Sequence, residues 1–241
     1  MPSDVLGTTV FNMKTNEFDF HKGPIFADIV LVDEINRAPA KTQSALFEVM
    51  EERQISIDGT THRMGELYTI LATQNPVEQE GTYKLPEAQL DRFLMKLTMD
   101  YPSLDEEVNI LERHHSNAAL VKLDDITPAL TKEELLTLRA FMKNVFVDRT
   151  LLQYIALIVQ QTRTSKAVYL GASPRASVAM MQASKAYALL QGRDFVTPED
   201  IKFVAPYVLQ HRLILTAEAE MEGYSPVKVT QRLIDKVEVP K

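Results

Sequence analysis

The sequence contains no cysteine among its 241 residues. A disulfide framework, a thiolate zinc site and a cysteine nucleophile are therefore excluded. The absence of cysteine also fits a reducing cytoplasm, which is the location we expect. No apolar run approaches the roughly 18–20 residues that cross a bilayer, and the first residues, MPSD, lack the basic and apolar regions of a signal peptide. We therefore expect no membrane span.

Basic residues are in the minority, because 26 lysines and arginines stand against 33 aspartates and glutamates. The net charge of −7 and the pI near 5.3 argue against sequence-blind binding to nucleic acid, which needs basic surface to release counterions. A local basic patch stays possible. Otherwise, 45% hydrophobic and 24% charged residues are typical of a globular chain of one large or two ordinary domains.

The first hundred residues read mainly as β structure. Segment 29–34, IVLVDE, has four consecutive apolar residues without alternation, which predicts a strand buried on both faces in a parallel sheet covered by helices. The other predicted extended segments are hairpins at 8–20 and 55–64 and sheet strands at 68–72 and 93–99. Helices are predicted from Pro39 and over 85–93. The sequence therefore indicates an α/β region.

Beyond Pro102 the pattern becomes helical. Capping boxes at 103–106 and 131–134 predict helices to about His115 and Val145, and a third helix is predicted over 149–162. Ser173 and Thr197, each followed by proline, predict two more helix starts. The residues from 225 onward are too mixed to assign. We place the boundary near Pro102, which gives an α/β domain at 1–102 and an all-helical domain at 103–241.

Two groups of polar residues follow buried strands. Asp33 and Glu34 close the first strand, and Asn75 follows the strand at 68–72. The carboxyl edge of an open α/β sheet is where ligands bind, and paired carboxylates there can orient Mg²⁺ and polarise a water. A neutral amide can orient the same water. Each feature alone has a plain reading, because strands often end in acids and asparagine before proline is often a turn.

Two arginines are further candidates. Arg92 lies at a predicted helix-to-strand junction, from which it can reach a neighbouring subunit as an arginine finger does. Arg175 lies in the first turn of a helix, where the macrodipole disfavours a cation and the helix end favours a phosphate. The plain readings are a surface salt bridge for Arg92 and simple tolerance for Arg175.

Together, and in this order, these features resemble the AAA+ ATPases, and in detail the MoxR family. The stretches that carry the resemblance are GPIF (23–26), VDEINRAP (32–39), KTQSAL (41–46), ATQNP (72–76), EGTY (80–83), LPEAQLDRF (85–93) and GASPR (171–175). The resemblance implies a partial AAA+ P-loop-type parallel sheet with helices, followed by an all-helical lid.

The resemblance also implies roles for single residues. Asp33 and Glu34 resemble the Walker B pair, with Asp33 in the magnesium shell and Glu34 as the base, and Asn75 resembles sensor 1. Arg92 resembles the finger that acts on an adjacent protomer, and Arg175 resembles sensor 2. ATP and Mg²⁺ are the implied cofactors. Complete family members are chaperone-like remodelling machines, commonly hexameric, often with von Willebrand factor A domain partners. We expect Glu34, Asn75, Arg175 and a neighbour's Arg92 to converge on one triphosphate pocket.

The family's P-loop, G-x-x-x-x-G-K-[ST], is absent, because none of the eight glycines is followed by lysine. In the family this motif precedes a stretch like PSDVLG (2–7), so the chain is expected to begin inside the ATPase domain. The strands at 68–72 and 93–99 then lack a shared neighbour, and unpaired buried strand groups cost about 1–3 kcal/mol each. We therefore predict poor stability in isolation, or a partner that fills the gap, and no ATP hydrolysis by this chain alone.

Two alternatives remain open. One is a module that binds ring subunits or clients without nucleotide turnover, which the missing P-loop favours. The other is a DNA remodeller, because replicative helicases share such hairpins. The acidic charge argues against the second, and Arg53, His62 and Arg63 are too few for a basic patch.

Overall fold

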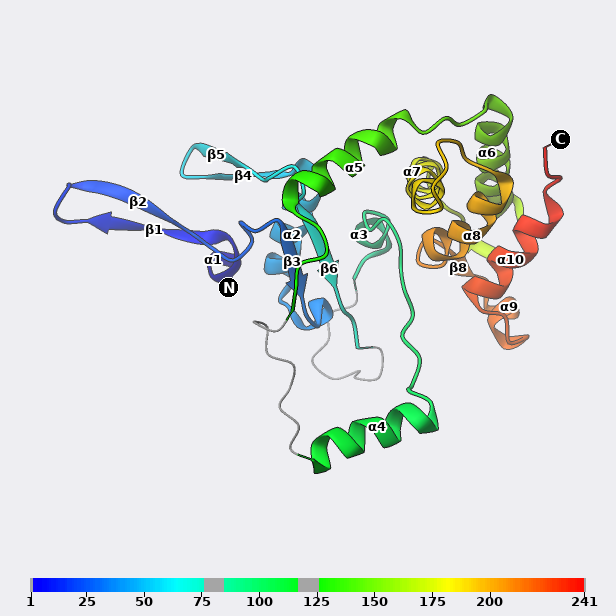
Figure 1. Ribbon diagram of the computed structural model, residues 1–241, viewed down its shortest axis with the longest axis horizontal. Coiled ribbons are helices and arrows are strands. Elements are labelled where there is room, and N and C mark those ends of the chain that lie inside the picture. The colour runs from blue at the N-terminus through cyan, green and yellow to red at the C-terminus, as the bar shows by residue number, and fades with distance from the viewer. Residues whose placement is uncertain (1, 76–84, 117–125, 241) are drawn as a thin grey trace.

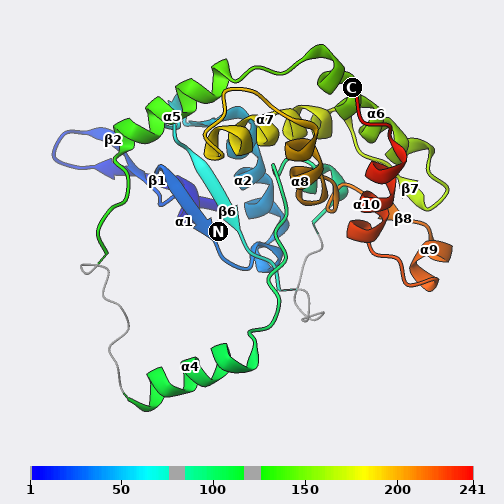
Figure 2. The same ribbon diagram turned by 45° about the vertical axis from the view of Figure 1, so that its right-hand side comes forward.

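The computed structural model describes residues 2–75, 85–116 and 126–240. It has a mixed α/β region and a helical region, which lie side by side in Figures 1 and 2. In chain order the described elements are α1 (Pro2–Leu6), β1 (Gly7–Asn12), β2 (Glu17–Lys22), β3 (Ile29–Val32), η1 (Ile35–Arg37), α2 (Ala40–Glu52), β4 (Gln54–Ile57), β5 (Thr60–Arg63), β6 (Thr69–Ala72), α3 (Glu87–Leu90), α4 (Leu104–His115), α5 (Lys132–Asn144), α6 (Arg149–Thr164), β7 (Val168–Leu170), α7 (Pro174–Leu190), α8 (Pro198–Leu209), β8 (Ile214–Leu215), α9 (Ala217–Met221) and α10 (Pro226–Lys236).

The central feature of the α/β region is a parallel pair of strands, β3 and β6, in the register Ile29 to Thr69 and Val32 to Ala72. One face of the pair packs on a core built around α2, with Leu46 and Phe47 buried at its centre. The other face is open, because Ile29 and Leu31 are 62% and 66% exposed. The prediction of a strand buried on both faces is therefore wrong for the described residues, where helices cover one face only.

Both predicted hairpins are present. β1 pairs with β2 and β4 pairs with β5, each antiparallel, and both project away from the body on the same side in Figure 1. Asp58 and Gly59 form the β4–β5 turn with φ of 49° and 80°, the left-handed values that a two-residue hairpin loop requires. At the base of the first hairpin a Cβ on Gly23 would lie 2.3 Å from the carbonyl oxygen of Val5, so only glycine fits there.

The strand predicted over 93–99 is not formed. The backbone of this segment is hydrogen-bonded to the helical region instead. The Lys96 N–H donates to the carbonyl of Tyr207 at 2.9 Å, and the Arg212 guanidinium donates to the carbonyls of Phe93 and Leu94. Met95 packs on the core of the helical region. The prediction of a sheet strand is therefore wrong, because the helical region, and not a neighbouring strand, supplies the hydrogen-bond partners of this segment.

The predicted helix starts in the second half are confirmed. Ser103 and Thr131 form complete capping boxes with Glu106 and Glu134, and the Ser173 hydroxyl caps α7. The carboxylates of Glu106 and Glu134 accept bonds from the cap residues, and these bonds lower the pKa of both groups.

Two features of the helical region were not predicted. α10 fills the segment left unassigned, and Ser225 and Pro226 begin it as a cap and first residue. β7 and β8 form a short antiparallel pair, so the region is not all-helical. The core of this region is formed by α6, α7, α8 and α10, with Tyr154 and Ile158 almost fully buried. The division at Pro102 stays a prediction.

α4 is separate from both cores in Figures 1 and 2, and none of its residues is buried.

No helix of the described ranges combines the length and apolar character of a membrane span.

Candidate functional site

The carboxyl ends of β3 and β6 bring together three of the predicted residues: Asp33, Glu34 and Asn75. The strands run parallel with Val32 opposite Ala72, so the residues that follow each strand leave at the same edge. The N–H of Thr73 donates to the Val32 carbonyl at 3.0 Å, and the N–H of Ile35 donates to the Thr73 carbonyl at 3.0 Å. These reciprocal bonds fix the two chain segments against each other.

Thr73 links the two acids, and sequence analysis gave it no role. Its hydroxyl donates to the carboxylate of Asp33 and accepts the backbone N–H of Glu34 at 2.9 Å. One side chain therefore sets both the orientation of the Asp33 carboxylate and the backbone position of Glu34. Thr73 directly precedes the QN pair in the ATQNP stretch, so its place beside the acids could have been inferred from the parallel pairing alone.

Glu34 has an unusual backbone conformation for a glutamate, with φ of 47° and ψ of 50°. A non-glycine residue in this left-handed region costs about 1–3 kcal/mol and persists where the surroundings enforce it. Its carboxylate accepts a bond from the Nε of Arg37 at 3.0 Å, and both side chains are partly exposed. The carboxylate therefore lies at the surface of the sheet edge, within reach of water and of a ligand.

Asn75 lies beside the acids through Asn36. The Nδ2 group of Asn36 donates to the Asn75 carbonyl at 3.3 Å, while the Oδ1 atom of Asn36 is buried without a hydrogen-bond partner. Gln43, also buried, donates to the carbonyl of Ile35 at 3.1 Å. The side chains of Asn36 in η1 and Gln43 in α2 therefore hold the backbone around Ile35 and Asn75 in place by hydrogen bonds. Pro76 and the EGTY stretch (80–83) lie outside the described residues.

The two predicted arginines meet at a different place. The carboxylate of Glu51, in the last turn of α2, binds Arg92 through one oxygen and Arg175 through the other. Arg92 also donates to the Phe47 carbonyl at 3.3 Å. A salt bridge was the plain alternative for Arg92, and sequence analysis did not identify Glu51 as its partner.

The acids and the arginines lie at opposite ends of α2. Asp33 and Glu34 precede the helix, which begins at Ala40, and Glu51 is near its end at Glu52. At 1.5 Å per residue, Glu51 lies about 16 Å along the helix axis from Ala40. Within one chain the structure therefore brings Asp33, Glu34 and Asn75 together, and brings Arg92 and Arg175 together, but does not join the two groups.

A buried joint positions both arginines. Asp91, the residue before Arg92, accepts a bond from the Ser173 hydroxyl at 2.8 Å and from the Nε of Arg212 at 2.8 Å. Ser173 in turn accepts the N–H of Arg175 at 3.1 Å. The loop that carries Arg92 and the helix that carries Arg175 are therefore tied to the same carboxylate.

Burial perturbs two ionisable groups at this joint. Desolvation lowers the pKa of His211 to about 4, with the neighbouring charge of Arg212 acting in the same direction. Burial also lowers the pKa of Arg212, while the bond to Asp91 opposes that shift. His211 is therefore neutral at pH 7, and its Nε2 lies 3.1 Å from the Phe93 carbonyl. The arginine remains charged.

Metal binding at the sheet edge rests on few protein ligands. The described residues contain no group of three or more histidine, aspartate or glutamate side chains arranged to hold a metal ion. Mg²⁺ usually keeps several waters and binds through one or two carboxylates plus phosphate oxygens. The Asp33 carboxylate and the Thr73 hydroxyl, both hard oxygen donors in contact with each other, fit that mode.

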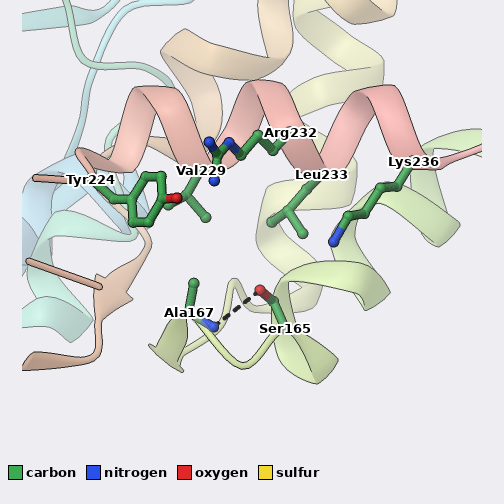
Figure 3. A pocket seen from close by; sticks show the side chains of 7 residues that line it. All are labelled: Ser165, Ala167, Tyr224, Val229, Arg232, Leu233 and Lys236. Atoms are coloured by element: carbon green, nitrogen blue, oxygen red, sulfur yellow. Dashed lines mark hydrogen bonds between the residues drawn. The ribbon is translucent and has the colours of Figure 1, made fainter. Parts of the chain in front are cut away.

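A small hollow in the described part of the chain lies away from these residues. Figure 3 shows it between α10 and the end of α6, lined by Ser165, Ala167, Tyr224, Val229, Arg232, Leu233 and Lys236. Its volume is about 90 Å³, whereas ligand pockets usually enclose about 300–1,000 Å³. It contains none of the predicted site residues, so we do not place the chemistry there.

Comparison with known proteins identifies family segments in both halves of the chain. Residues 1–95 match the model of the ATPase family associated with various cellular activities (AAA), and residues 160–235 match an AAA lid domain. The protein YeaC of Bacillus subtilis (strain 168) is 47% identical over 240 residues, covering 100% of this chain and 74% of YeaC.

Two further similarities extend over the whole chain. Chaperone MoxR1 of Mycobacterium tuberculosis is 42% identical over 255 residues, covering 100% of this chain and 65% of MoxR1. The crystal structure of a candidate ATPase from Cytophaga hutchinsonii superposes on this chain with a TM-score of 0.89, and the two sequences are 40% identical. The match covers 100% of this chain and 75% of that one. The chain spans about two thirds to three quarters of these relatives, and it belongs to the AAA+ ATPases of MoxR type.

Proposed function

We propose that this chain works in ATP binding and hydrolysis that drive chaperone-like remodelling or maturation of client protein complexes. The observation that carries the proposal is the convergence of Asp33, Glu34 and Asn75 at the carboxyl edge of two parallel strands. Similarity to a protein named as a chaperone supports the remodelling role. In this proposal residues 1–102 are part of the nucleotide-binding domain, and residues 103–241 are the lid.

Asp33 is the proposed magnesium residue. Its carboxylate and the Thr73 hydroxyl are the oxygen donors that would hold the ion, which supplies positive charge at the phosphate oxygens when bound. Thr73 keeps the carboxylate in place, and its second bond, to the N–H of Glu34, keeps the next residue in register.

Glu34 is the proposed general base. A water on the terminal phosphate side of the sheet edge gives its proton to the Glu34 carboxylate as its oxygen attacks the γ-phosphorus of ATP. The bond between that phosphorus and the β–γ bridging oxygen breaks in the same step, and ADP is the leaving group. The Glu34 carboxylate forms an ion pair with Arg37, and this pair opens when the carboxylate accepts the proton. Asn75 orients the same water with its side-chain amide, which carries no charge that would compete with the phosphate.

Arg92 and Arg175 are proposed to act together on the nucleotide of a neighbouring copy. Both bind Glu51, which lies about 16 Å along the α2 axis from Ala40, whereas the acids of their own chain precede that helix. Two copies, with the arginines of one facing the acids of the next, unite all five residues. Such a head-to-tail contact closes into a ring when the rotation permits, and a hexamer is the proposed assembly, with a von Willebrand factor A domain protein as one class of partner.

The P-loop decides how this proposal is tested. The full sequence contains no G-x-x-x-x-G-K-[ST] motif, so the backbone cradle and lysine that hold phosphates must come from another segment. We expect the purified chain to show no magnesium-dependent ATP turnover above background. The informative experiment joins a P-loop-bearing segment of an AAA+ ATPase ahead of Pro2 and measures phosphate release.

The fused protein should hydrolyse ATP, and E34Q should abolish turnover while leaving nucleotide binding intact. E48Q is the matched control, because Glu48 is an exposed glutamate of α2 with the same charge change. A fused protein that binds ATP but turns it over equally well with E34Q would contradict the assignment of the base. Turnover by the unfused chain that disappears with E34Q would contradict the need for a separate P-loop.

A second candidate function is a non-hydrolysing module that binds ring subunits or clients. The open apolar face of β3 and β6, with Ile29, Leu31 and Leu71 exposed, favours it because uncovered aliphatic surface marks an interaction site. Sedimentation of this chain mixed with a P-loop-bearing member of the family tests it. Stable co-assembly without any gain in ATP turnover supports the module, and absence of co-assembly rejects it.

A further inference from the structure

The cluster of Arg92, Glu51 and Arg175 has a specific geometry. One carboxylate lies between two guanidinium groups and offers a separate oxygen to each. The two arginines come from different parts of the chain, since Arg92 follows α3 and Arg175 lies in the first turn of α7. The carboxylate is therefore an intramolecular anion held at the meeting point of two cations.

Each arginine is positioned by contacts other than Glu51. Arg92 donates to the Phe47 carbonyl at 3.3 Å, and its neighbour Asp91 is bound by Arg212 at 2.8 Å. Arg175 is anchored through its N–H to the Ser173 hydroxyl. Removal of the Glu51 charge should therefore leave the Arg92 guanidinium on the Phe47 carbonyl and the backbone of Arg175 in place, so that both side chains remain available to an anion.

The cluster is accessible and carries an excess of positive charge. The side chains of Arg175 and Glu51 are 50% and 33% exposed, so solvent reaches both. Two guanidinium groups stand against a single carboxylate. A phosphate group has more negative charge than a carboxylate and more oxygens, and it can bond to two guanidinium groups at once. It is therefore a stronger occupant of the position that Glu51 fills.

We propose that Glu51 is a displaceable counter-ion that holds Arg92 and Arg175 together as a preformed site for the terminal phosphate of a nucleotide on a second copy. This inference rests on the proposed function for the identity of the occupant. The carboxylate keeps the two cations from repelling each other before the neighbour arrives. It gives way when the phosphate enters, and no covalent bond changes.

The experiment measures anion binding directly and needs no turnover. Inorganic pyrophosphate is titrated into the purified 241-residue chain by calorimetry at fixed low ionic strength, since salt screens exposed ion pairs. E51Q should bind pyrophosphate about tenfold more tightly than the unaltered chain, because each exposed ion pair that no longer competes accounts for a few-fold. Circular dichroism checks that every variant is folded.

Glu52→Gln is the matched control, since Glu52 is the next residue of α2, is exposed and changes the charge equally. It should leave pyrophosphate affinity within twofold of the unaltered chain. In E51Q/R92Q and E51Q/R175Q the gain should disappear. Equal affinities for E51Q and E52Q, or a gain that survives loss of either arginine, would overturn the proposal.

A second measurement separates the two possible sources of the phosphate. Mg²⁺-ATP is added to the E51Q variant of the fused, P-loop-bearing protein in sedimentation experiments. Association that depends on ATP and is lost with R175Q assigns the site to a nucleotide on another copy. Pyrophosphate binding without such association overturns that assignment and identifies a site for free polyphosphate. Neither result depends on hydrolysis, so failure of the proposed ATPase activity remains distinguishable.

Discussion

Replacement of Arg212 by methionine should destabilise the protein far more than an ordinary loss of an ion pair. The Arg212 side chain is 3% exposed, and it binds the Asp91 carboxylate at 2.8 Å. It also donates to the carbonyls of Asp91 at 3.0 Å and Leu94 at 3.2 Å and to those of Phe93 and Val208. Methionine fills much of the same volume but leaves these acceptors unpaired.

The magnitude follows from burial. Removal of one partner of a buried ion pair costs about 3–5 kcal/mol, because the remaining charge is left without compensation. Lys132→Met is the matched control, since Lys132 also joins the helical region to the α/β region through Asp28 at 2.7 Å but is 53% exposed. An exposed pair contributes about 0–1 kcal/mol.

Urea unfolding of both variants, followed by far-ultraviolet circular dichroism, compares the two values directly. The sequence has no tryptophan, so helix content is the practical observable. We expect the free energy of unfolding to fall by about 3–5 kcal/mol for R212M and by less than about 1 kcal/mol for K132M. Losses that agree within about 0.5 kcal/mol would refute the reasoning that burial at this joint sets its contribution.

Three further predictions follow from the same structure. Folding lowers the pKa of His211 from 6.5 to about 4, so the unfolded chain binds the proton more readily and the free energy of unfolding falls as the pH drops below 6.5. Between pH 7 and pH 5 this loss is about 2 kcal/mol. Urea unfolding at the two pH values should show the loss in the unaltered chain and not in H211Q. T73V should lower ATP turnover of the fused protein about 10²-fold with little change in unfolding free energy, because both acids lose their shared positioning group. G23A should lower the free energy of unfolding by about 1–3 kcal/mol in thermal and urea unfolding, since its methyl group would overlap the Val5 carbonyl. G59A is the control, because its Cβ would lie in open space and only the strain of its positive φ should show.

Local features of the fold were predictable where a few neighbouring residues determine them. The Asp58-Gly59 turn, the capping boxes at Ser103 and Thr131, and the strand that ends in Asp33 all follow from short-range stereochemistry. α10 could have been predicted as well, because Ser225-Pro226 repeats the start found at Ser173-Pro174. The mixed composition after that start obscured a strongly amphipathic helix.

The features that sequence analysis missed depend on distant contacts. The segment at 93–99 has the apolar pattern of a strand, but hydrogen bonds to the Tyr207 carbonyl and from the side chains of Gln210 and Arg212 decide its conformation. Glu51 reads as one acid among several at the end of α2, and one of its partners is 124 residues away. No spacing rule links such positions. The site roles of Asp33, Glu34, Asn75, Arg92 and Arg175 stay predictions until the variants are measured.

The shared carboxylate of Asp91 has a mechanical consequence. It binds Ser173 and Arg212, so the segment before Arg92 is held to the helical region and should move with it as one body. A rotation of the helical region would carry both guanidinium groups in the same direction and by similar amounts. In the assembly that we propose, a subunit that contacts its neighbour's nucleotide would therefore reorient its own helical region in the same movement.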